Sequence, residues 1–183
     1  MKQNTTRTLV LAALLAAFTT VATMIIKIPT PTMGYIHLGD GLVLLCGILL
    51  GPGLGAAAAG IGSVFADIFS GYAAWAPATL IIKAATAFLV GWVFHKLYVS
   101  GFATPVRTVL AGIPAEIVMV FGYYVYEVGL AMAGGSAFRA AAVATASGVP
   151  FNIVQGAAGV IVSAVLLPVL SRASGDLRAR IHA

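Results

Sequence analysis

Residues 8–26 read TLVLAALLAAFTTVATMII, an apolar run without a single charged side chain. A helix needs about 20 apolar residues to cross the hydrocarbon core of a bilayer, so this run predicts a membrane-spanning helix. It follows a short polar and basic lead, as the apolar core of a signal peptide would. The run is longer than the roughly 7–15 residues of such a core and ends without a clean small-residue cleavage site. We therefore interpret it as a retained first span.

The composition of the whole chain predicts that lipid is its main solvent. Of the 183 residues, 61% are hydrophobic and 8% are charged, whereas soluble domains carry about 25% charged residues. The formal net charge of +5 comes from 10 Lys and Arg against 5 Asp and Glu. No basic face with interleaved aromatics accompanies this charge, which argues against nucleic acid as a partner. Cys46 is the only cysteine, so an intrachain disulfide and a cysteine-based zinc site are excluded.

Breaks rich in proline and glycine divide the rest of the chain into further apolar runs. Pro29 and Pro31 end the first span because proline donates no backbone hydrogen bond. The stretch through Gly34–Asp40 is expected to be a loop packed on the bundle, with Asp40 as the N-cap of the next helix. Gly51-Pro52-Gly53 predicts a tight turn. A Gly/Ala/Ser-rich loop is expected at 133–147, and the tail after residue 170 is polar.

The predicted fold class is an all-α integral membrane protein that forms a single domain over residues 1–183. The second and third helices are shorter than a full crossing, so we expect them to be tilted or sheltered by neighbours. The predicted architecture is a bundle of six transmembrane helices at residues 8–26, 41–50, 54–69, 77–94, 108–130 and 150–170.

Basic residues predict the orientation of this bundle. With the amino terminus inside, only Lys27 and Arg139 lie outside, and Lys83 lies within the membrane. Cytoplasmic segments of membrane proteins carry an excess of Lys and Arg, so this bias predicts that both termini are cytoplasmic. The residues that would then be cytoplasmic are Lys2, Arg7, Lys96, Arg107, Arg172, Arg178 and Arg180.

Polar residues inside the apolar runs recur at helical spacing. Ionisable groups inside a span cost about 2.5–3.5 kcal/mol on insertion scales, so each such group is a candidate for function. Several polar faces in one bundle are expected to point inward, and nearly all of the cluster lies in the outer half, with Glu116 deeper. The sequence therefore predicts an outward-opening polar pocket. The faces are Trp75/Thr79/Lys83/Thr86, Glu116/Tyr123/Glu127, Asn152/Gln155/Gly159/Ser163 and Ser63/Asp67.

We expect nine residues of this pocket and of the first loop to bind a ligand. Structural alternatives stay open: Lys83 as an ion pair with Asp67 or Glu116, Asn152 as a helix cap, and Trp75 as an interfacial aromatic. Glu116, which lies deeper, is better explained as structural. The nine candidate substrate-binding residues are Tyr35, His37, Trp75, Thr79, Lys83, Tyr123, Glu127, Asn152 and Gln155.

Small residues form a second pattern, on the first helix. Ala12, Ala13, Ala16 and Ala17 make two overlapping AxxxA pairs, and such faces allow helices to approach closely. They serve either packing within the bundle or docking of another membrane subunit. The sequence has no GxxxxGK[ST], HExxH or GxSxG motif, so we expect no catalytic residue, no metal site and no cofactor on this chain.

Three stretches resemble the substrate-binding S components of energy-coupling factor (ECF) vitamin transporters. They are Gly34-Tyr35-Ile36-His37-Leu38-Gly39-Asp40, Leu49–Gly55 and Ala76–Lys83, which accompany the AxxxA pairs and the six short helices. The resemblance covers essentially the whole chain, and it is greatest to the riboflavin, hydroxymethylpyrimidine and pyridoxine branch.

The resemblance implies a protein of a prokaryotic plasma membrane that captures a water-soluble vitamin from outside. It implies that a transmembrane T subunit docks on the alanine face of helix one and that two cytoplasmic ATPases supply the energy. A pyridine- or pyrimidine-type vitamin is the first expectation and riboflavin the second. The alternatives are a solitary S-component-like transporter without ATPases, an accessory membrane protein without a ligand and, last, an intramembrane enzyme.

Overall fold

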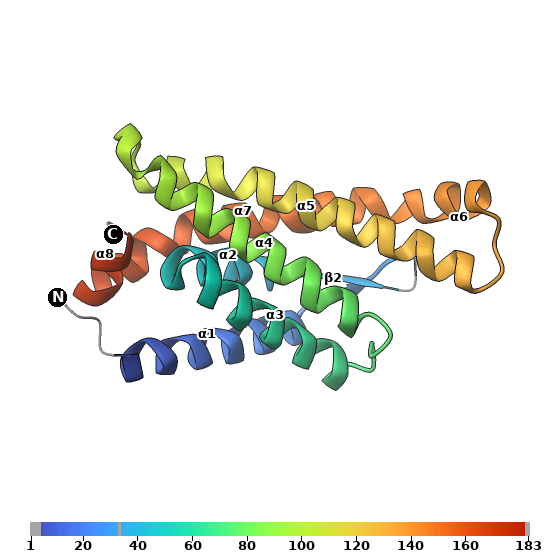
Figure 1. Cartoon of the computed structure of the whole chain (residues 1–183), viewed down its shortest axis with the longest axis horizontal. Coiled ribbons are helices and arrows are strands. Elements are labelled where there is room, and N and C mark those ends of the chain that lie inside the picture. Colours follow the sequence, from blue (N-terminus) through green and yellow to red (C-terminus); the bar gives the residue numbers. More distant parts are fainter. Residues whose placement is uncertain (1–4, 33, 182–183) are drawn as a thin grey trace.

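The six apolar runs all form helices that run along the long axis of the bundle (Figure 1). The computed structural model describes residues 5–32 and 34–181. Five of its helical segments are long and apolar enough to cross a membrane, and one apolar helix is shorter. The chain is therefore a multi-pass membrane protein. The six helices are α1 (Thr5–Ile25), α2 (Asp40–Leu50), α3 (Pro52–Phe69), α4 (Ala76–Lys96), α5 (Thr104–Ala133) and α7 (Val149–Ala173).

One segment expected to be a loop is helical, and so is the polar tail, for which the sequence predicts no structure. The prediction of a loop at 133–147 is wrong, because this segment contains α6 (Phe138–Thr145) and the start of a 3-10 turn, η2 (Ala146–Gly148). Its alanines are strong helix formers, and their propensity outweighs the glycine-rich entry at Gly134 and Gly135. After residue 170, α7 continues to Ala173 and α8 (Gly175–Ile181) follows. A further 3-10 turn, η1 (Leu97–Ser100), connects α4 with α5.

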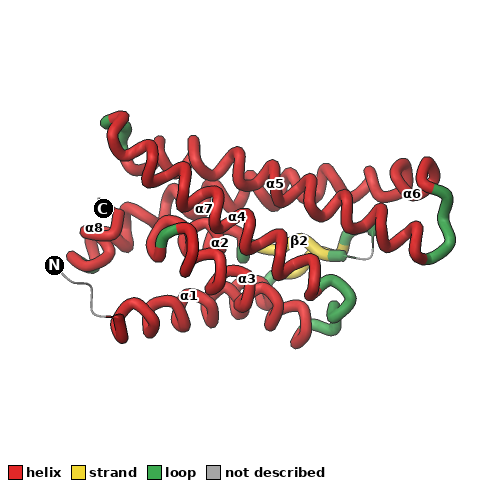
Figure 2. The backbone as a smooth tube through the Cα atoms, in the orientation of Figure 1, coloured by secondary structure: helices red, strands yellow, loops and turns green. Residues whose placement is uncertain are grey.

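The first loop contains a two-stranded antiparallel hairpin. Strand β1 (Lys27–Pro29) pairs with β2 (Tyr35–His37), in the register Lys27–His37, Ile28–Ile36 and Pro29–Tyr35. Figure 2 shows both strands among the helices and toward the end of the bundle where α6 lies. The strand β2 packs against α7 and α1, so the expectation that this loop packs on the bundle is confirmed.

Helix α2 is the centre of the bundle. It contacts α1, α3, α4, α7 and α8, and all of its residues except Leu42 and Leu50 are buried. The expectation that neighbouring helices shelter this short helix from lipid is therefore confirmed. The predicted N-cap role of Asp40 is wrong: α2 begins at Asp40, Gly39 is its N-cap and no side chain caps it. The buried Asp40 carboxylate binds side chains of α4 and α7 instead.

Close packing of α2 requires glycine at its contact with α4. A Cβ atom added at Gly47 would lie 2.0 Å from the carbonyl oxygen of Ala87. We predict that Gly47→Ala lowers the free energy of unfolding by about 1–3 kcal/mol, because overpacking forces backbones apart. Gly53→Ala is the matched control, since a Cβ atom there meets nothing within 4 Å. Denaturant unfolding in detergent measures both variants, and equal stability of the two would contradict this packing.

Basic side chains join the chain ends at one end of the bundle. Arg180 Nη2 of α8 donates to Thr8 Oγ1 of α1 at 2.9 Å. Arg107 Nη2 of α5 donates to the carbonyl oxygens of Phe94, at 3.1 Å, and Ile181, at 3.2 Å. The start of α1, the α4–α5 connection and α8 therefore lie together, and α6 lies at the opposite end (Figure 1). Lys2, one of the basic residues predicted to be cytoplasmic, lies outside the described residues.

Candidate functional site

A small polar pocket lies between the hairpin and the adjacent ends of α3, α4, α5 and α7. We call it the inner pocket. Eight of the nine predicted ligand-binding residues line it, although they come from four different elements: β2, α4 with its N-cap Trp75, α5 and α7. The lining residues are Thr30, Gly34, Tyr35, His37, Asp67, Trp75, Thr79, Tyr123, Glu127, Asn152 and Gln155.

The polar faces predicted from helical spacing are buried. On α4, Thr79, Lys83 and Thr86 are 3%, 0% and 0% exposed. The buried residues of α5 include Glu116, Tyr123 and Glu127, and those of α7 include Asn152, Gln155, Gly159 and Ser163. The prediction that these faces point inward is therefore confirmed.

Aromatic rings form one wall of the inner pocket. The rings of Tyr35 and Tyr72 are 4.4 Å apart and tilted, and Tyr72 meets Trp75 edge-on at 6.0 Å. Tyr35 also contacts the His37 ring at 5.5 Å. Of these rings, Tyr35, His37 and Trp75 line the pocket, and aromatic rings at such positions provide apolar surface for a planar ligand.

The hairpin donates hydrogen bonds to side chains of three helices around the inner pocket. Tyr35 donates to Asp67 Oδ1 of α3 at 2.7 Å, and the backbone N–H of His37 donates to Gln155 Oε1 of α7 at 2.8 Å. Thr32 Oγ1 donates to Glu127 Oε1 of α5 at 2.9 Å. Burial, followed by the charge of Asp67, raises the pKa of Tyr35, so its hydroxyl remains a donor.

Two polar atoms of the pocket lining are left without a hydrogen-bond partner among the described residues. They are the indole nitrogen of Trp75, a donor, and Oδ2 of Asp67, an acceptor. Buried polar groups are nearly always paired, and an unpaired one costs free energy. A ligand that presents an acceptor to Trp75 and a donor to Asp67 would satisfy both atoms.

Lys83 is the one predicted ligand-binding residue that lies outside the inner pocket. Its ammonium group forms an ion pair with Asp40 Oδ1, and both side chains are fully buried. Gln155 Nε2 donates to the other carboxylate oxygen, Asp40 Oδ2, at 2.7 Å. The expected structural alternative, an ion pair with Asp67 or Glu116, named the wrong partner. Gln155 thus connects the pocket with a buried ion pair behind it.

The inner pocket is nearly closed. Its cavity of about 20 Å³ has room for about one water molecule, whereas sites for small organic ligands measure about 300–1,000 Å³. A cavity of about 310 Å³ adjoins it and shares Trp75 and Glu127 with it. We call this the outer cavity; its other lining residues are Pro31, Thr32, Leu130, Ala131, Ala144 and Thr145. Thr32 of the outer cavity donates its hydrogen bond to Glu127, which lines both spaces.

His37 is held as a neutral imidazole. Burial, followed by the nearby charge of Lys83, lowers the pKa of His37 from 6.5 to about 3. The backbone N–H of Gly39 donates to His37 Nδ1 at 3.0 Å, so the neutral ring carries its proton on Nε2. The ring therefore offers an uncharged donor on the pocket side of the hairpin.

This buried histidine predicts acid sensitivity. The folded pKa lies below the unfolded one, so the unfolded chain binds more protons between about pH 3 and pH 6.5. The free energy of unfolding consequently falls as the pH falls through that window, by on the order of 2 kcal/mol between pH 7 and pH 5. His37→Asn keeps an acceptor for Gly39 but does not titrate, so its melting temperature should fall less over this range. Equal falls in the two proteins would contradict this origin.

The alanine pairs of α1 separate into an inward and an outward pair. Ala12 is buried and Ala16 half-buried, and Ala16 lies against α3, where a Cβ atom at Gly62 would be 2.4 Å from the Ala16 carbonyl oxygen. Ala13 and Ala17 are exposed. Packing within the bundle accounts for the first pair, and only the second remains open to a partner.

Of the hairpin residues at the site, the sequence predicts Tyr35 and His37 but not those of the turn between the two strands. Thr30, Thr32 and Gly34 contribute through a strand turn that carries no helical periodicity. Helical spacing predicts that Asp67 faces inward, but Asp67 is not among the nine ligand-binding candidates. Its spacing of four from the buried Ser63 was the available signal.

These features define the class: a polytopic helical membrane protein with a small polar pocket at one end of its bundle. The chain belongs to the family of S components of ECF-type riboflavin transporters, whose family model matches residues 3–172. A Pyrococcus woesei protein described as "Uncharacterized protein in gap 3'region" is 36% identical over 160 residues, which cover 86% of this chain and 97% of that protein.

A solved structure described as the S component of a bacterial ECF transporter shares the fold. It superposes with a TM-score of 0.70 at 21% identity, over 92% of this chain and 98% of that chain. S components are substrate-binding subunits of transporters and not enzymes, so the predicted family and protein class are confirmed.

Proposed function

We propose that this chain captures a water-soluble vitamin or vitamin precursor from the extracellular side, as the substrate-binding subunit of an ECF importer. The observation that carries the proposal is the inner pocket. It combines an aromatic wall with an unpaired indole donor at Trp75 and an unpaired carboxylate acceptor at Asp67. A flat heterocycle with ring acceptors and donor substituents matches this set.

The charges around the pocket restrict the ligand class. Asp67 and Glu127 line the inner pocket, and among the described residues no Lys or Arg does. Lys83, the cation predicted to bind the ligand, forms an ion pair with Asp40 instead. These observations favour a neutral or cationic heterocycle over an anionic vitamin. Pyridoxine and hydroxymethylpyrimidine are our first candidates, and riboflavin, which the family name supports, is the next.

The distribution of charge supports an outward-facing pocket. Arg107 and Arg180 lie at the end of the bundle opposite to α6 and away from the hairpin. Among the described residues, Lys27 of β1 and Arg139 of α6 lie toward the pocket end, and Lys83 is paired with Asp40 inside the bundle. Because basic residues are enriched in cytoplasmic segments, we place both termini in the cytoplasm and the pocket outside. A T subunit and two ATPases would then energise release from the inner face.

Tryptophan fluorescence tests the proposed site with a built-in control. The chain has two tryptophans: Trp75 lines the inner pocket, and Trp92 is 44% exposed on α4. Titration with pyridoxine, hydroxymethylpyrimidine or riboflavin should saturably change the emission of the Trp92→Phe protein. In Trp75→Phe the saturable change should be lost. A saturable response that remains in Trp75→Phe and vanishes in Trp92→Phe would place the ligand elsewhere.

A further inference from the structure

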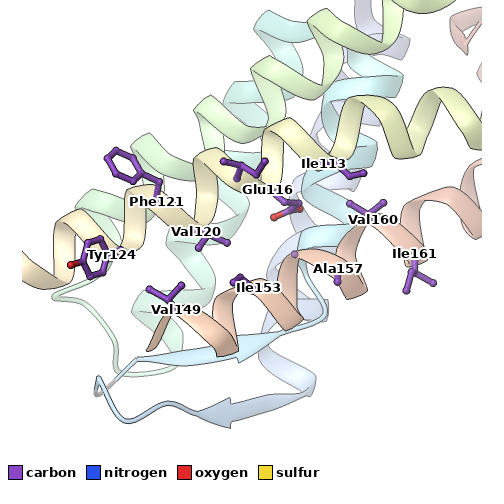
Figure 3. A pocket seen from close by; sticks show the side chains of 12 residues that line it. Ile113, Glu116, Val120, Phe121, Tyr124, Val149, Ile153, Ala157, Val160 and Ile161 are labelled. Atoms are coloured by element: carbon purple, nitrogen blue, oxygen red, sulfur yellow. The ribbon is translucent and has the colours of Figure 1, made fainter. Parts of the chain in front are cut away.

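Glu116 is a buried carboxyl group without a partner, and the proposed vitamin site does not use it. Its side chain is 5% exposed, and neither carboxyl oxygen has a hydrogen-bond partner among the described residues. Figure 3 shows the group pointing from α5 toward α7. There it faces bare backbone: Cβ atoms added at Gly156 and Gly159 would each lie 3.2 Å from a Glu116 oxygen. The two glycines therefore leave room for the carboxyl group between the helices.

The carboxyl group of Asp40 lies beside that of Glu116, and Lys83 supplies one ammonium group for both. A Cβ atom at Gly159 would also lie 2.8 Å from Cβ of Asp40, so Asp40 and Glu116 border the same glycine. Asp40 receives the Lys83 ammonium and the Gln155 amide. Glu116 receives neither, so an ionised Glu116 would be an uncompensated negative charge inside the membrane.

Among the described residues, no second cation near Lys83 compensates that charge. Helix α2 contributes Asp40, α4 contributes the paired Lys83, and β2 contributes the neutral His37. Helix α5 itself adds the Tyr123 hydroxyl, which hydrogen-bonds with Thr79 at 3.0 Å. On α7, the only ionisable side chain is Arg172, in its last turn, many turns from Gly156.

A lipid-facing groove leads to this carboxyl group. It measures about 570 Å³, is lined by residues of α5 and α7 and includes Glu116 (Figure 3). Its remaining lining is almost entirely apolar: Ile117 and Phe121 of α5 are 63% and 66% exposed, and Ile161 of α7 is 64% exposed. In a membrane-spanning bundle, exposed apolar side chains of this kind face acyl chains. Small apolar molecules in the bilayer thus have a path toward Glu116.

We propose that Glu116 is a proton-binding site that is occupied at neutral pH. Small apolar molecules in the bilayer can reach it through the α5–α7 groove. The bound proton makes the Asp40–Lys83–Glu116 cluster electrically neutral. Binding is the simple equilibrium in which the carboxylate accepts a proton from hydronium and leaves water. The proposal is independent of the identity of the vitamin.

Infrared spectroscopy tests proton occupancy directly. The chain has two glutamates, Glu116 and Glu127, so in the Glu127→Gln protein a ¹³C label on glutamate carboxyl carbons reports Glu116 alone. At pH 7 we expect an isotope-shifted C=O stretch of a protonated carboxylic acid, which disappears as the pH is raised. A labelled carboxylate band at pH 7 without the acid band would overturn the proposal. Loss of the acid band on addition of Na⁺ at constant pH would also overturn it, since the site would then bind a metal cation.

An apolar carbodiimide tests access from the lipid. In this reaction the acid proton passes to a carbodiimide nitrogen, the carboxyl oxygen bonds to the central carbon, and an acyl shift to nitrogen gives a stable N-acylurea. Dicyclohexylcarbodiimide applied to the protein in liposomes at pH 7 should add to Glu116, as located by peptide mass spectrometry, and labelling should fall as the pH rises. Absence of that adduct, or labelling that does not change with pH, would contradict a lipid-accessible proton site.

Discussion

Replacing Lys83 by methionine is expected to lower the free energy of unfolding by about 3–5 kcal/mol, because it leaves a buried charge without its partner. The Asp40 carboxylate is fully buried and forms its ion pair with the Lys83 ammonium. In Lys83→Met, the Gln155 amide would be the one side-chain hydrogen-bond donor left to it among the described residues. Denaturant unfolding of the purified protein in detergent measures the loss.

Two controls separate the ion pair from other effects of the substitution. Lys96→Met changes an exposed lysine of the same helix and should alter stability by less than about 1 kcal/mol. The double variant Asp40→Asn, Lys83→Met removes both charges and should recover much of the stability lost in the single variant. A single variant as stable as Lys96→Met would show that the pair contributes nothing.

Tryptophan at Ala13 and Ala17 is expected to abolish vitamin uptake while leaving ligand binding intact. Both alanines are exposed on α1, and bulky side chains there would block close approach of a partner helix. The change should not disturb the bundle, because the inward pair, Ala12 and Ala16, provides the contact with α3. Uptake by cells and ligand binding by the purified variant measure the two properties.

The matched control places the same bulk on another lipid-facing helix. Ile161 and Val165 of α7 are also four residues apart and are 64% and 62% exposed. Tryptophan at both positions should preserve uptake and copurification of the T subunit and ATPases. If the Ala13/Ala17 variant takes up the vitamin normally, α1 is not the docking face. If no ATPase or T subunit copurifies with the unchanged protein, that result would favour a solitary transporter over an importer coupled to ATPases.

The sequence predicts the helices well because apolar length is a strong signal in membrane proteins. All six apolar runs are helical, and the prolines at 29 and 31 mark the end of the first. The hairpin has no such signal, since each of its strands is three residues long. Asp40 illustrates a different limit: its type and position fit an N-cap, but the carboxylate's partners are 43 and 115 residues away.

The site could be predicted in part because polar residues inside apolar helices are also a strong signal. Residues such as Thr79, Tyr123 and Gln155 repeat at helical spacing, and a bundle surrounded by lipid must turn polar faces inward. Spacing does not reveal which inward residue contacts which. It therefore groups Lys83 with the pocket residues, although the Lys83 side chain lies behind the pocket. The pairing of Lys83 with Asp40 depends on how α2 packs against α4, and local sequence does not encode that distance.

Calorimetric titration of the purified chain with pyridoxine, hydroxymethylpyrimidine and riboflavin tests the central claim, vitamin capture by the inner pocket, most directly. We predict saturable binding of one of these heterocycles at one molecule per chain. We also predict at least about tenfold weaker binding in Asp67→Asn, because a buried hydrogen bond to a charged group contributes about 1.5–3 kcal/mol. Absence of binding by any of the three, and by other B vitamins, pyrimidines and purine-like bases, would contradict the account.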